Sequence, residues 1–326
     1  MISPEQYFAL SQEEQVAGLQ KLGEAALVEF GVQPVAIEPL VHAENTTFKV
    51  SSAQCAFNLR ISRPGYQSSS NIRSEIAFLS ALRDAGFRVP KPWQERLVTA
   101  SDPSVPEPRD VVLLHWMDGE FSKGVMTVER AQKIGRFMAR MHEFSLSWDM
   151  PGGFDRQSLH AWAFNPRRPM PFDQPTPLAF EEDRLLLIEE DRGARELLAS
   201  LPRDAEWFGL IHSDLHLGNV LFEGDELNVI DFDDTGFGFW LYDFAAALCY
   251  AVDSDDYPEF RDAMLESYQE VRKLPPQTRE LLPPFIRLRA AGIANWVLSR
   301  PDNPWFRENG AGFVHKLCDR IRVVRE

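Results

Sequence analysis

One segment of the chain, residues 209–248, concentrates the side chains that could do chemistry. Asp214 and Asn219 precede a short apolar run, and Asp231 follows a second one. A turn at residues 223–226 separates the two runs and predicts a β-hairpin, which brings its two ends together. We therefore expect a carboxylate, an amide and another carboxylate to lie side by side at one end of this hairpin. These are hard oxygen ligands, and they suit Mg²⁺ carrying a polyphosphate.

The same residues could also form a zinc cluster or a solvated acidic turn. His212, Asp214 and His216 stand at i, i+2 and i+4, a spacing that a zinc cluster could also use. A zinc cluster, however, would leave Asn219 and the hairpin leading to Asp231 without a role. The acidic run that Asp231 begins could also be a solvated turn, which is the default for such a run alone. The apolar residues around it and the upstream pattern favour a metal-binding loop.

The segment resembles a known group of enzymes. The pattern His-x-Asp-x-His-x-x-Asn at 212–219, followed by a hairpin and Ile-Asp-Phe-Asp-Asp at 230–234, is similar to the catalytic and metal loops of protein-kinase-like phosphotransferases. This version of the pattern looks like the aminoglycoside/choline phosphotransferase family. Residues 59–68 and 231–248 look most like a bacterial group that includes stress-response Ser/Thr kinases and type II homoserine-kinase relatives. The resemblance covers the chain from about residue 35 onward and implies ATP and Mg²⁺ as cofactors.

The resemblance implies a role for each polar residue of the segment. Asp214 would accept or orient the proton of the acceptor hydroxyl, which requires hydrogen-bond reach of that group. Asn219 and Asp231 would hold Mg²⁺ on the ATP phosphates. His212 would brace the catalytic loop, and Asp243, at the start of an apolar helix, would anchor that loop through backbone N–H groups. Phosphoryl transfer depends mainly on positioning and charge neutralisation, so these residues should matter greatly.

A cation and its partner come from the first third of the chain. By pattern, Arg60 stands where protein kinases place the strand lysine that meets the α- and β-phosphates, and Glu75 on the next helix would be its ion-pair partner. Arginine is a departure from the lysine version. Its planar guanidinium is always charged and binds bidentately, so it can still hold phosphate and carboxylate in an altered geometry.

The remaining nucleotide contacts also depart from the protein-kinase pattern. Residues 42–48 contain no GxGxxG motif, and Asn45 and Thr46 would offer side-chain and backbone donors to the phosphates instead. Trp116 and Met117 would form the hinge and give backbone hydrogen bonds to adenine.

Local patterns predict the elements that must position these residues. Ser11 and Glu14 form a capping-box sequence that predicts the start of a helix. Alternating apolar residues predict a strand hairpin around residues 51–54, and residues 111–114 read as a strand. Further helices are predicted by apolar spacing at about residues 71–85, 128–144, 180–201, 260–271 and 284–299.

These elements predict an α+β, protein-kinase-like bilobal fold. Residues 1–115 would form a small N-terminal lobe, which consists of a nucleotide-binding antiparallel sheet and a helix. Residues 116–119 would form the hinge. Residues 120–326 would form a larger helical lobe with the catalytic and metal loops, and ATP would bind between the lobes.

Composition narrows the partners and the location. The chain has 34 Lys and Arg against 49 Asp and Glu, a formal net charge of −15. Nucleic-acid binders and proteins of anionic membrane surfaces need basic patches, so this balance argues against both. The start of the sequence has no signal-peptide pattern, and no apolar stretch approaches the ~20 residues of a membrane span. The three cysteines lie far apart, which is typical of reduced thiols. We expect a cytoplasmic protein.

The sequence therefore predicts ATP- and Mg²⁺-dependent transfer of the γ-phosphoryl group to a hydroxyl of a small molecule. The acceptor would be an aminoglycoside, an amino alcohol, a sugar or a homoserine-like compound. Two alternatives stay open: a Ser/Thr protein kinase of the stress-response type, and a nucleotide-binding pseudokinase or scaffold. A proline-rich stretch at residues 165–177, with Trp162, Arg167 and Arg168 in and beside it, is a candidate for shaping the acceptor site.

Overall fold

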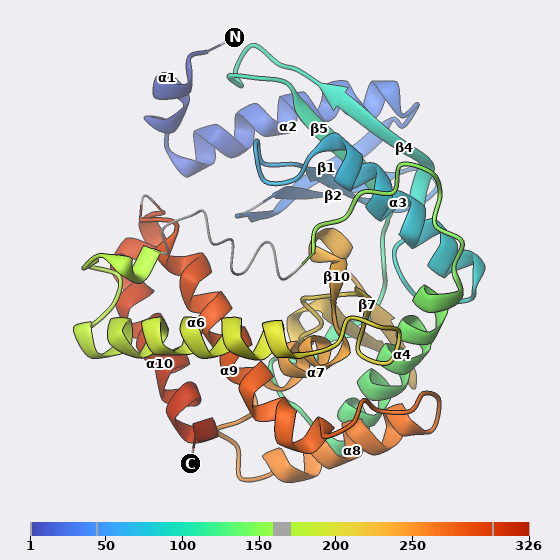
Figure 1. Ribbon diagram of the computed structural model, residues 1–326. Helices are drawn as coiled ribbons and strands as arrows, with labels where there is room; N and C mark the ends of the chain where they lie inside the picture. The colour runs from blue at the N-terminus through green and yellow to red at the C-terminus, as the bar shows by residue number, and fades with distance from the viewer. Residues whose placement is uncertain (1, 44, 159–170, 302, 326) are drawn as a thin grey trace. The chain divides into compact units, whose positions relative to one another are not determined.

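The computed structural model describes residues 2–43, 45–158, 171–301 and 303–325 of the 326-residue chain (Figure 1). The chain forms two compact units, each assembled from three stretches of sequence. The first unit consists of Met1–Gly119, Asp149–Arg156 and Asn228–Asp233, and the second of Glu120–Trp148, Gln157–Leu227 and Asp234–Glu326. The candidate residues Asp214 and Asp231 therefore belong to different units.

A five-stranded antiparallel sheet with the strand order β1-β2-β3-β5-β4 forms the centre of the first unit. Its strands are β1 (Pro34–His42), β2 (Thr46–Ser52), β3 (Ala56–Ile61), β4 (Pro92–Ala100) and β5 (Arg109–His115). β-Branched and aromatic residues favour strands, and they alternate along β2 and β3. Phe48 lies opposite Leu59 and Thr47 opposite Arg60, which confirms the predicted hairpin.

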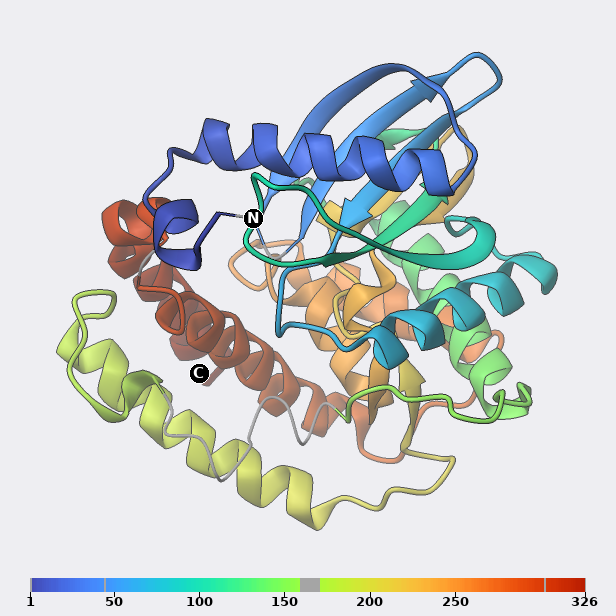
Figure 2. The same ribbon diagram turned by 90° about the horizontal axis from the view of Figure 1, so that it is seen from above.

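Helix α2 (Gln12–Glu29) packs over one face of this sheet (Figure 2). The capping box predicted at its start is present: the Ser11 side chain accepts from the Glu14 N–H, and the Glu14 carboxylate accepts from the Ser11 N–H. Gly23 allows a close approach, because a Cβ there would lie 2.7 Å from Leu59 Cδ2. The buried core beneath α2 includes Leu19, Leu22, Ala26, Leu27, Phe30, Phe48, Val50, Phe57, Leu59, Ile61, Val98, Val111 and Leu113.

Two further helices belong to the first unit, the short α1 (Pro4–Phe8) and α3 (Ser69–Asp84). Helix α3 matches the helix predicted near residues 71–85 and contacts β4. The Ser68 side chain caps it by accepting a hydrogen bond from the Asn71 N–H. Its buried stripe contains Ile72, Ile76, Leu79 and Leu82.

Helices dominate the second unit. They are α4 (Val128–Ser147), α6 (Glu181–Ser200), α7 (Trp240–Leu248), α8 (Tyr257–Gln269), α9 (Thr278–Leu298) and α10 (Pro304–Arg325). Helix α4 packs on α8, and α9 packs on α6, α7 and α10. Every residue of α7 is buried, so this apolar helix lies inside the unit. The segment that contains the candidate residues thus ends in a buried helix.

Short strands and 3₁₀ turns carry the segment that contains the candidate residues. The strands are β6 (Glu120–Phe121), β7 (Phe208–Ile211), β8 (Val220–Glu223), β9 (Glu226–Val229) and β10 (Gly236–Phe239). The 3₁₀ turns are η1 (Pro171–Asp173), η2 (Leu217–Asn219) and η3 (Phe232–Asp234), of which η3, like β9, includes residues of both units. β7 pairs with β10, and β6, β8 and β9 form a second small sheet in that order. The expected hairpin at residues 220–230 is thus present.

Three helices differ from the sequence prediction, one of them the short α1, which has no counterpart among the predicted elements. Helix α9 begins at Thr278 and not near residue 284, so that Pro283 and Pro284 lie inside it. The prediction placed these prolines at the helix start, where proline is most favoured, but the helix accommodates them after its first turn. Helix α10 has no counterpart in the predicted elements. Gly310 and Gly312 lower the helix propensity of its sequence, and packing on α9 and α6 outweighs them.

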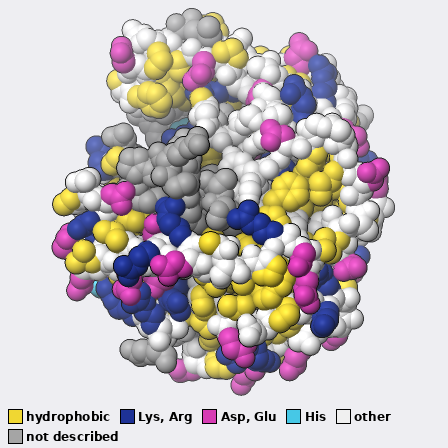
Figure 3. All heavy atoms as spheres, viewed as in Figure 1, with side chains coloured by type: hydrophobic (Ala, Val, Ile, Leu, Met, Phe, Trp, Pro, Cys, Tyr) yellow, Lys and Arg dark blue, Asp and Glu magenta, His cyan; other side chains and the backbone are white. Residues whose placement is uncertain are grey.

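Acidic side chains do not cluster on the face drawn in Figure 3. On the face drawn in Figure 3, Lys and Arg side chains lie among Asp, Glu and apolar ones. Within the described ranges, no helix combines the length and the apolar character that crossing a bilayer requires.

Candidate active site

Arg60 of β3 and Glu75 of α3 form a bidentate ion pair in the first unit. Arg60 Nη1 donates to Glu75 Oε1 at 2.8 Å, and Nη2 donates to Oε2 at 2.5 Å. The two side chains are only 4% and 1% exposed. Parallel N–H···O bonds of this kind are among the strong charge-assisted hydrogen bonds. The structure thus brings together the two residues that the sequence pairs.

Asp233 of η3 is a third charged member of this cluster. Its Oδ1 lies 3.8 Å from Arg60 Nη1, and its Oδ2 accepts a hydrogen bond of 2.7 Å from Asn45 Nδ2. Burial alone would lower the pKa of Arg60, but Glu75 and Asp233 outweigh burial and raise it. Burial raises the pKa of Asp233, against the opposing charge of Arg60. Sequence reasoning treated Asp233 only as part of an acidic run.

Asp231 lies two residues before Asp233, in the same unit. Its backbone is left-handed, with φ of 64°, a conformation that aspartate tolerates better than most residues. Its charge also contributes to the raised pKa of Arg60, so the two side chains lie within electrostatic range. Asn219 belongs to the second unit. That Asp231 lies beside Asn219 therefore stays a prediction.

The other predicted nucleotide contacts are already engaged within the first unit. The Asn45 side chain binds Asp233, and the buried Thr46 hydroxyl lies 2.7 Å from Nδ1 of His42. The Trp116 N–H donates to the Ala56 carbonyl at 3.0 Å. Its ring lies 4.6 Å from Lys49 Nζ. The partly buried Met117 follows it. The predicted contacts of Trp116 and Met117 with a nucleotide stay a prediction.

The segment Asp149–Arg156 supports this cluster, although no sequence motif marks it. Asp155 Oδ2 accepts hydrogen bonds from Ser70 Oγ at 2.6 Å and from Asn71 Nδ2 at 2.8 Å, and so holds the first turn of α3. Arg156 donates to the Asn71 carbonyl at 3.0 Å and also to the Asp233 carbonyl. The segment therefore ties the helix that carries Glu75 to the loop that carries Asp233.

A second group of residues surrounds Asp243, the buried first-turn carboxylate of α7. Its Oδ2 accepts from the His212 N–H at 3.0 Å, and its Oδ1 accepts from the Ser213 N–H at 2.7 Å. Ser213 has φ of 72°, so these bonds hold a left-handed residue directly before Asp214. The carboxylate thereby fixes the backbone of the catalytic loop.

A buried histidine completes the support of Asp243. His142 Nε2 lies 3.0 Å from Asp243 Oδ2, and its Nδ1 lies 3.0 Å from the Tyr268 hydroxyl. Burial lowers the pKa of His142 in spite of the neighbouring carboxylate. The imidazole is therefore neutral near pH 7. Its Nε2–H donates to Asp243, and its Nδ1 accepts from Tyr268.

Asp214 and Asn219 lie together on the candidate catalytic loop. Asn219 Nδ2 donates to both the carbonyl and Oδ2 of Asp214, each at 2.9 Å. Nε2 of His216 lies 3.4 Å from the same Oδ2, and its Nδ1 accepts from the Gly218 N–H. His212 Nδ1 accepts from the Asp214 N–H at 3.3 Å. The loop is held by its own polar side chains.

The Asp214 carboxylate is both charged and reachable. Its side chain is 20% exposed, and Arg289 of α9 contacts its Oδ1. Burial alone would raise the pKa of Asp214, but Arg289 and His216 outweigh burial and lower it. An ionised carboxylate of this kind can accept a hydrogen bond from an alcohol and orient its oxygen. Sequence reasoning missed Arg289, because no motif marks it.

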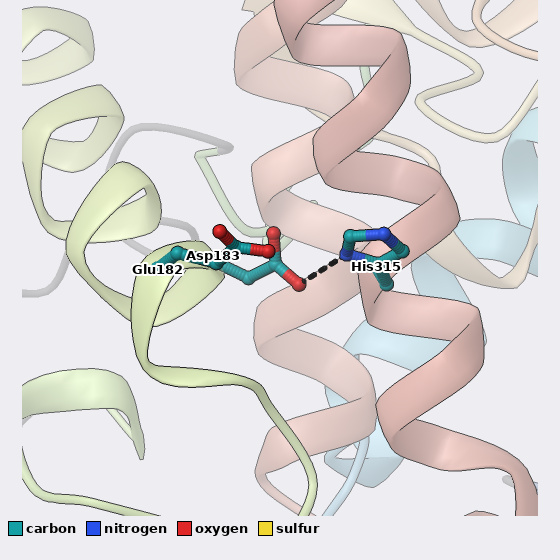
Figure 4. A group of neighbouring side chains, drawn as sticks. All are labelled: Glu182, Asp183 and His315. Atoms are coloured by element: carbon teal, nitrogen blue, oxygen red, sulfur yellow. Dashed lines mark hydrogen bonds and ion pairs between the residues drawn. The ribbon is translucent and has the colours of Figure 1, made fainter.

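A different group of potential metal ligands lies between α6 and α10. Figure 4 shows Glu182, Asp183 and His315 within reach of one another. Asp183 is buried, and its two oxygens accept from His315 Nδ1 at 2.8 Å and from Arg322 Nη2 at 2.6 Å. Because both oxygens are already engaged by side chains of α10, the group links two helices. The predicted acceptor-site residues Trp162, Arg167 and Arg168 lie outside the described residues.

The fold and the sequence patterns at residues 212–219 and 230–234 define a phosphotransferase of the protein-kinase-like type, an enzyme that acts on an alcohol group. Residues 36–281, most of the chain, match the family described as "Phosphotransferase enzyme family". The chain belongs to this family, which confirms the resemblance seen in the sequence.

Two curated relatives span most of the chain. It is 25% identical over 294 residues to the amicoumacin kinase of Bacillus subtilis (strain 168). The aligned region covers 83% of this chain and 82% of the relative. It is 26% identical over 310 residues to a homoserine kinase of Methylobacterium radiotolerans, covering 87% of this chain and 91% of the relative.

Solved structures agree with the assignment of the fold. A microcompartment-associated aminopropanol kinase has a TM-score of 0.78 and 27% identity, covering 92% of this chain and 95% of that one. The amicoumacin kinase hAmiN, in complex with AMP-PNP, Ca²⁺ and Ami, has a TM-score of 0.73 and 19% identity, covering 95% and 96%. The second likeness bears on the fold alone.

Proposed function

We propose that the protein transfers the γ-phosphoryl group of ATP, with Mg²⁺, to a hydroxyl group of a small molecule. The observation that carries this proposal is the Asp214 carboxylate, ionised, partly exposed and held on a loop that Asp243 anchors. In this role Asp214 binds the acceptor hydroxyl and aligns its oxygen for attack. Its lowered pKa makes it a weak base, so orientation is its main contribution.

The cofactor assignment rests on the donor atoms of two residues. Both hydrogen bonds of Asn219 to Asp214 use the amide nitrogen, which leaves the amide oxygen as the atom that would coordinate a cation. The Asp231 carboxylate is the second hard oxygen donor, and this set fits Mg²⁺. A bound Mg²⁺ would neutralise charge on the phosphates. Arg60, fixed by Glu75, would supply the protein's own cation to them.

The relatives support a narrower proposal for the acceptor. Aminopropanol and homoserine, which appear in the names of two of them, each carry an amino group and a hydroxyl. We infer that the acceptor is a small amino alcohol or hydroxy amino acid, in preference to an aminoglycoside or a plain sugar. We further infer a cytoplasmic location without nucleic-acid or membrane partners; Cys249 and Cys318 are buried free thiols, as expected there.

Two measurements test the proposal together. Thermal unfolding with ATP should show stabilisation that increases when Mg²⁺ is added, because Asn219 and Asp231 would hold Mg²⁺ and the ion would neutralise phosphate charge. ATP turnover should appear with an amino alcohol or a hydroxy amino acid in an acceptor panel. Asp214→Ala should abolish turnover and keep the ATP-dependent stabilisation.

Three outcomes would contradict the proposal. Full turnover by Asp214→Ala would remove the role of Asp214. Nucleotide binding that ignores Mg²⁺, with no turnover on any acceptor, would favour a pseudokinase or scaffold. Transfer to protein Ser/Thr in preference to every small acceptor would favour the protein-kinase alternative.

A further inference from the structure

Arg289, on helix α9, contacts the candidate catalytic aspartate from 75 residues further along the chain. Its Nη2 donates to Asp214 Oδ1, and its Nη1 lies 3.5 Å from the Ser213 carbonyl. The side chain is 12% exposed, so the contact is shielded from water on most sides. One guanidinium thus binds both the backbone and the carboxylate of the catalytic loop.

This contact complements those on the other carboxylate oxygen. Asn219 donates to Asp214 Oδ2, and His216 lies near the same atom, whereas Arg289 holds Oδ1. Donors on both oxygens restrict rotation of the carboxylate about its last side-chain bond. Without Arg289, the described contacts of the carboxylate would be confined to one oxygen.

Helix α7 holds Arg289 in turn. The guanidinium carbon lies 5.9 Å from the centre of the Tyr242 ring, and Tyr242 directly precedes Asp243. The same buried helix therefore supports the loop twice, through Asp243 on its backbone and through Tyr242 beneath Arg289. The charged and titratable groups that face Asp214 include Arg289, His216, His212, Tyr242 and Tyr250, and the last two also face Arg289.

We propose that Arg289 is a positioning residue for phosphoryl transfer, which fixes the Asp214 carboxylate in the orientation that aligns the acceptor hydroxyl. The inference rests on the proposed function, in which Asp214 binds that hydroxyl. Arg289 touches neither substrate nor nucleotide in this role and acts through Asp214 alone.

The kinetic test compares Arg289→Gln, Arg289→Lys and a matched control on the same helix. Arg289→Gln should lower kcat by about 10²-fold, the size of effect expected for a misplaced catalytic group, and leave the KM for ATP unchanged. Arg289→Lys should recover part of kcat, because an ammonium restores the charge but lacks the planar two-pronged contact. Arg287→Gln, which loses a 3.2 Å contact with Glu190 on α6, should keep kcat.

The kinetic pattern separates positioning from loss of structure, because general damage to the fold would change the KM for ATP as well as kcat. Equal kcat in Arg289→Gln and the wild type would overturn the proposal.

A double-mutant cycle tests the contact without any turnover. The shifts in unfolding midpoint of Asp214→Asn and Arg289→Gln should be non-additive in the double variant, because the two side chains are in contact. Additive shifts would overturn the proposal. If the wild-type protein transfers no phosphoryl group while the cycle is non-additive, the proposed function fails and the inferred catalytic role fails with it, but the contact stands.

Discussion

The Arg60 guanidinium and the Glu75 carboxylate meet through two parallel hydrogen bonds of 2.8 and 2.5 Å, and both side chains are almost fully buried. Taking two charges out of water is costly, and only close geometry offsets that cost. The pair therefore adds less to stability than its short distances suggest. Its value lies in holding a cation at a fixed place on β3.

Removal of one partner of this pair should be strongly destabilising. Glu75→Gln removes the nearest carboxylate from the buried Arg60 charge and leaves Asp233 at 3.8 Å, so we expect a loss of about 3–5 kcal/mol in the free energy of unfolding and a higher KM for ATP. Urea unfolding and ATP kinetics measure the two effects. Glu29→Gln is the matched control: its pair with Arg96 is 63% and 46% exposed, and its loss should cost under about 1 kcal/mol. Equal costs for the two substitutions would contradict the argument.

Loss of the Asp243 carboxylate should loosen the catalytic loop. In Asp243→Asn, one amide oxygen and one NH₂ group replace the two oxygens that accept from the backbone of His212 and Ser213. At least one buried N–H then lacks an acceptor, which should cost about 1–3 kcal/mol and lower kcat. Hydrogen exchange at these two amides should accelerate.

A surface carboxylate of the same unit provides the control for this change. Asp253 is 54% exposed and lies 3.5 Å from Arg320, so Asp253→Asn should leave both amides protected. Unchanged exchange rates in Asp243→Asn would show that the carboxylate does not hold the loop.

The segment before Arg156 should influence nucleotide binding through α3. Asp155→Ala removes the carboxylate that accepts from Ser70 and Asn71 and leaves Asn71 only the Asp155 carbonyl, which should cost about 0.5–1.5 kcal/mol of unfolding free energy. Because α3 carries Glu75, the KM for ATP should rise as well. Asp149→Asn changes an exposed residue of the same segment and should alter neither quantity. A wild-type KM in Asp155→Ala would mean that this segment does not position α3.

The link between α6 and α10 should make stability depend on pH. The hydrogen bond that His315 Nδ1 donates to the Asp183 carboxylate raises the pKa of His315 above 6.5. A raised pKa means that the stabilisation is complete below about pH 6.5 and is lost as the pH rises through the folded-state value. His315 is 37% exposed, so solvent screening limits the effect to at most about 1 kcal/mol.

Urea unfolding of the wild type and of His315→Gln measures this effect. The wild type should lose more stability than the variant between about pH 6 and about pH 8. The buried His142 has a lowered pKa and acts in the opposite direction, but it is present in both proteins and cancels in the comparison. Parallel pH curves would refute the contribution of His315.

Local sequence patterns were sufficient wherever neighbours along the chain decide the structure. The capping box at Ser11, the β2–β3 hairpin and helix α3 all follow from turn residues, caps and periodicity within a dozen positions. The pairing of Arg60 with Glu75 followed from a family pattern, because the spacing of strand and helix is part of that pattern. The sequence also identified the class of enzyme, since Asp214 and Asn219 stand on one short loop.

Tertiary structure alone decided which distant side chains support that loop. Arg289 and Asp214 are 75 residues apart, and His142 and Asp243 are 101 residues apart. Arg156 and the Asp233 carbonyl are 77 residues apart. A buried charge must find a partner, but sequence periodicity reports only which face of a helix is buried and not which helix packs against it. The residues proposed to do the chemistry could therefore be named from the sequence, whereas the residues that support their loop emerged only from the packing of α4, α7 and α9.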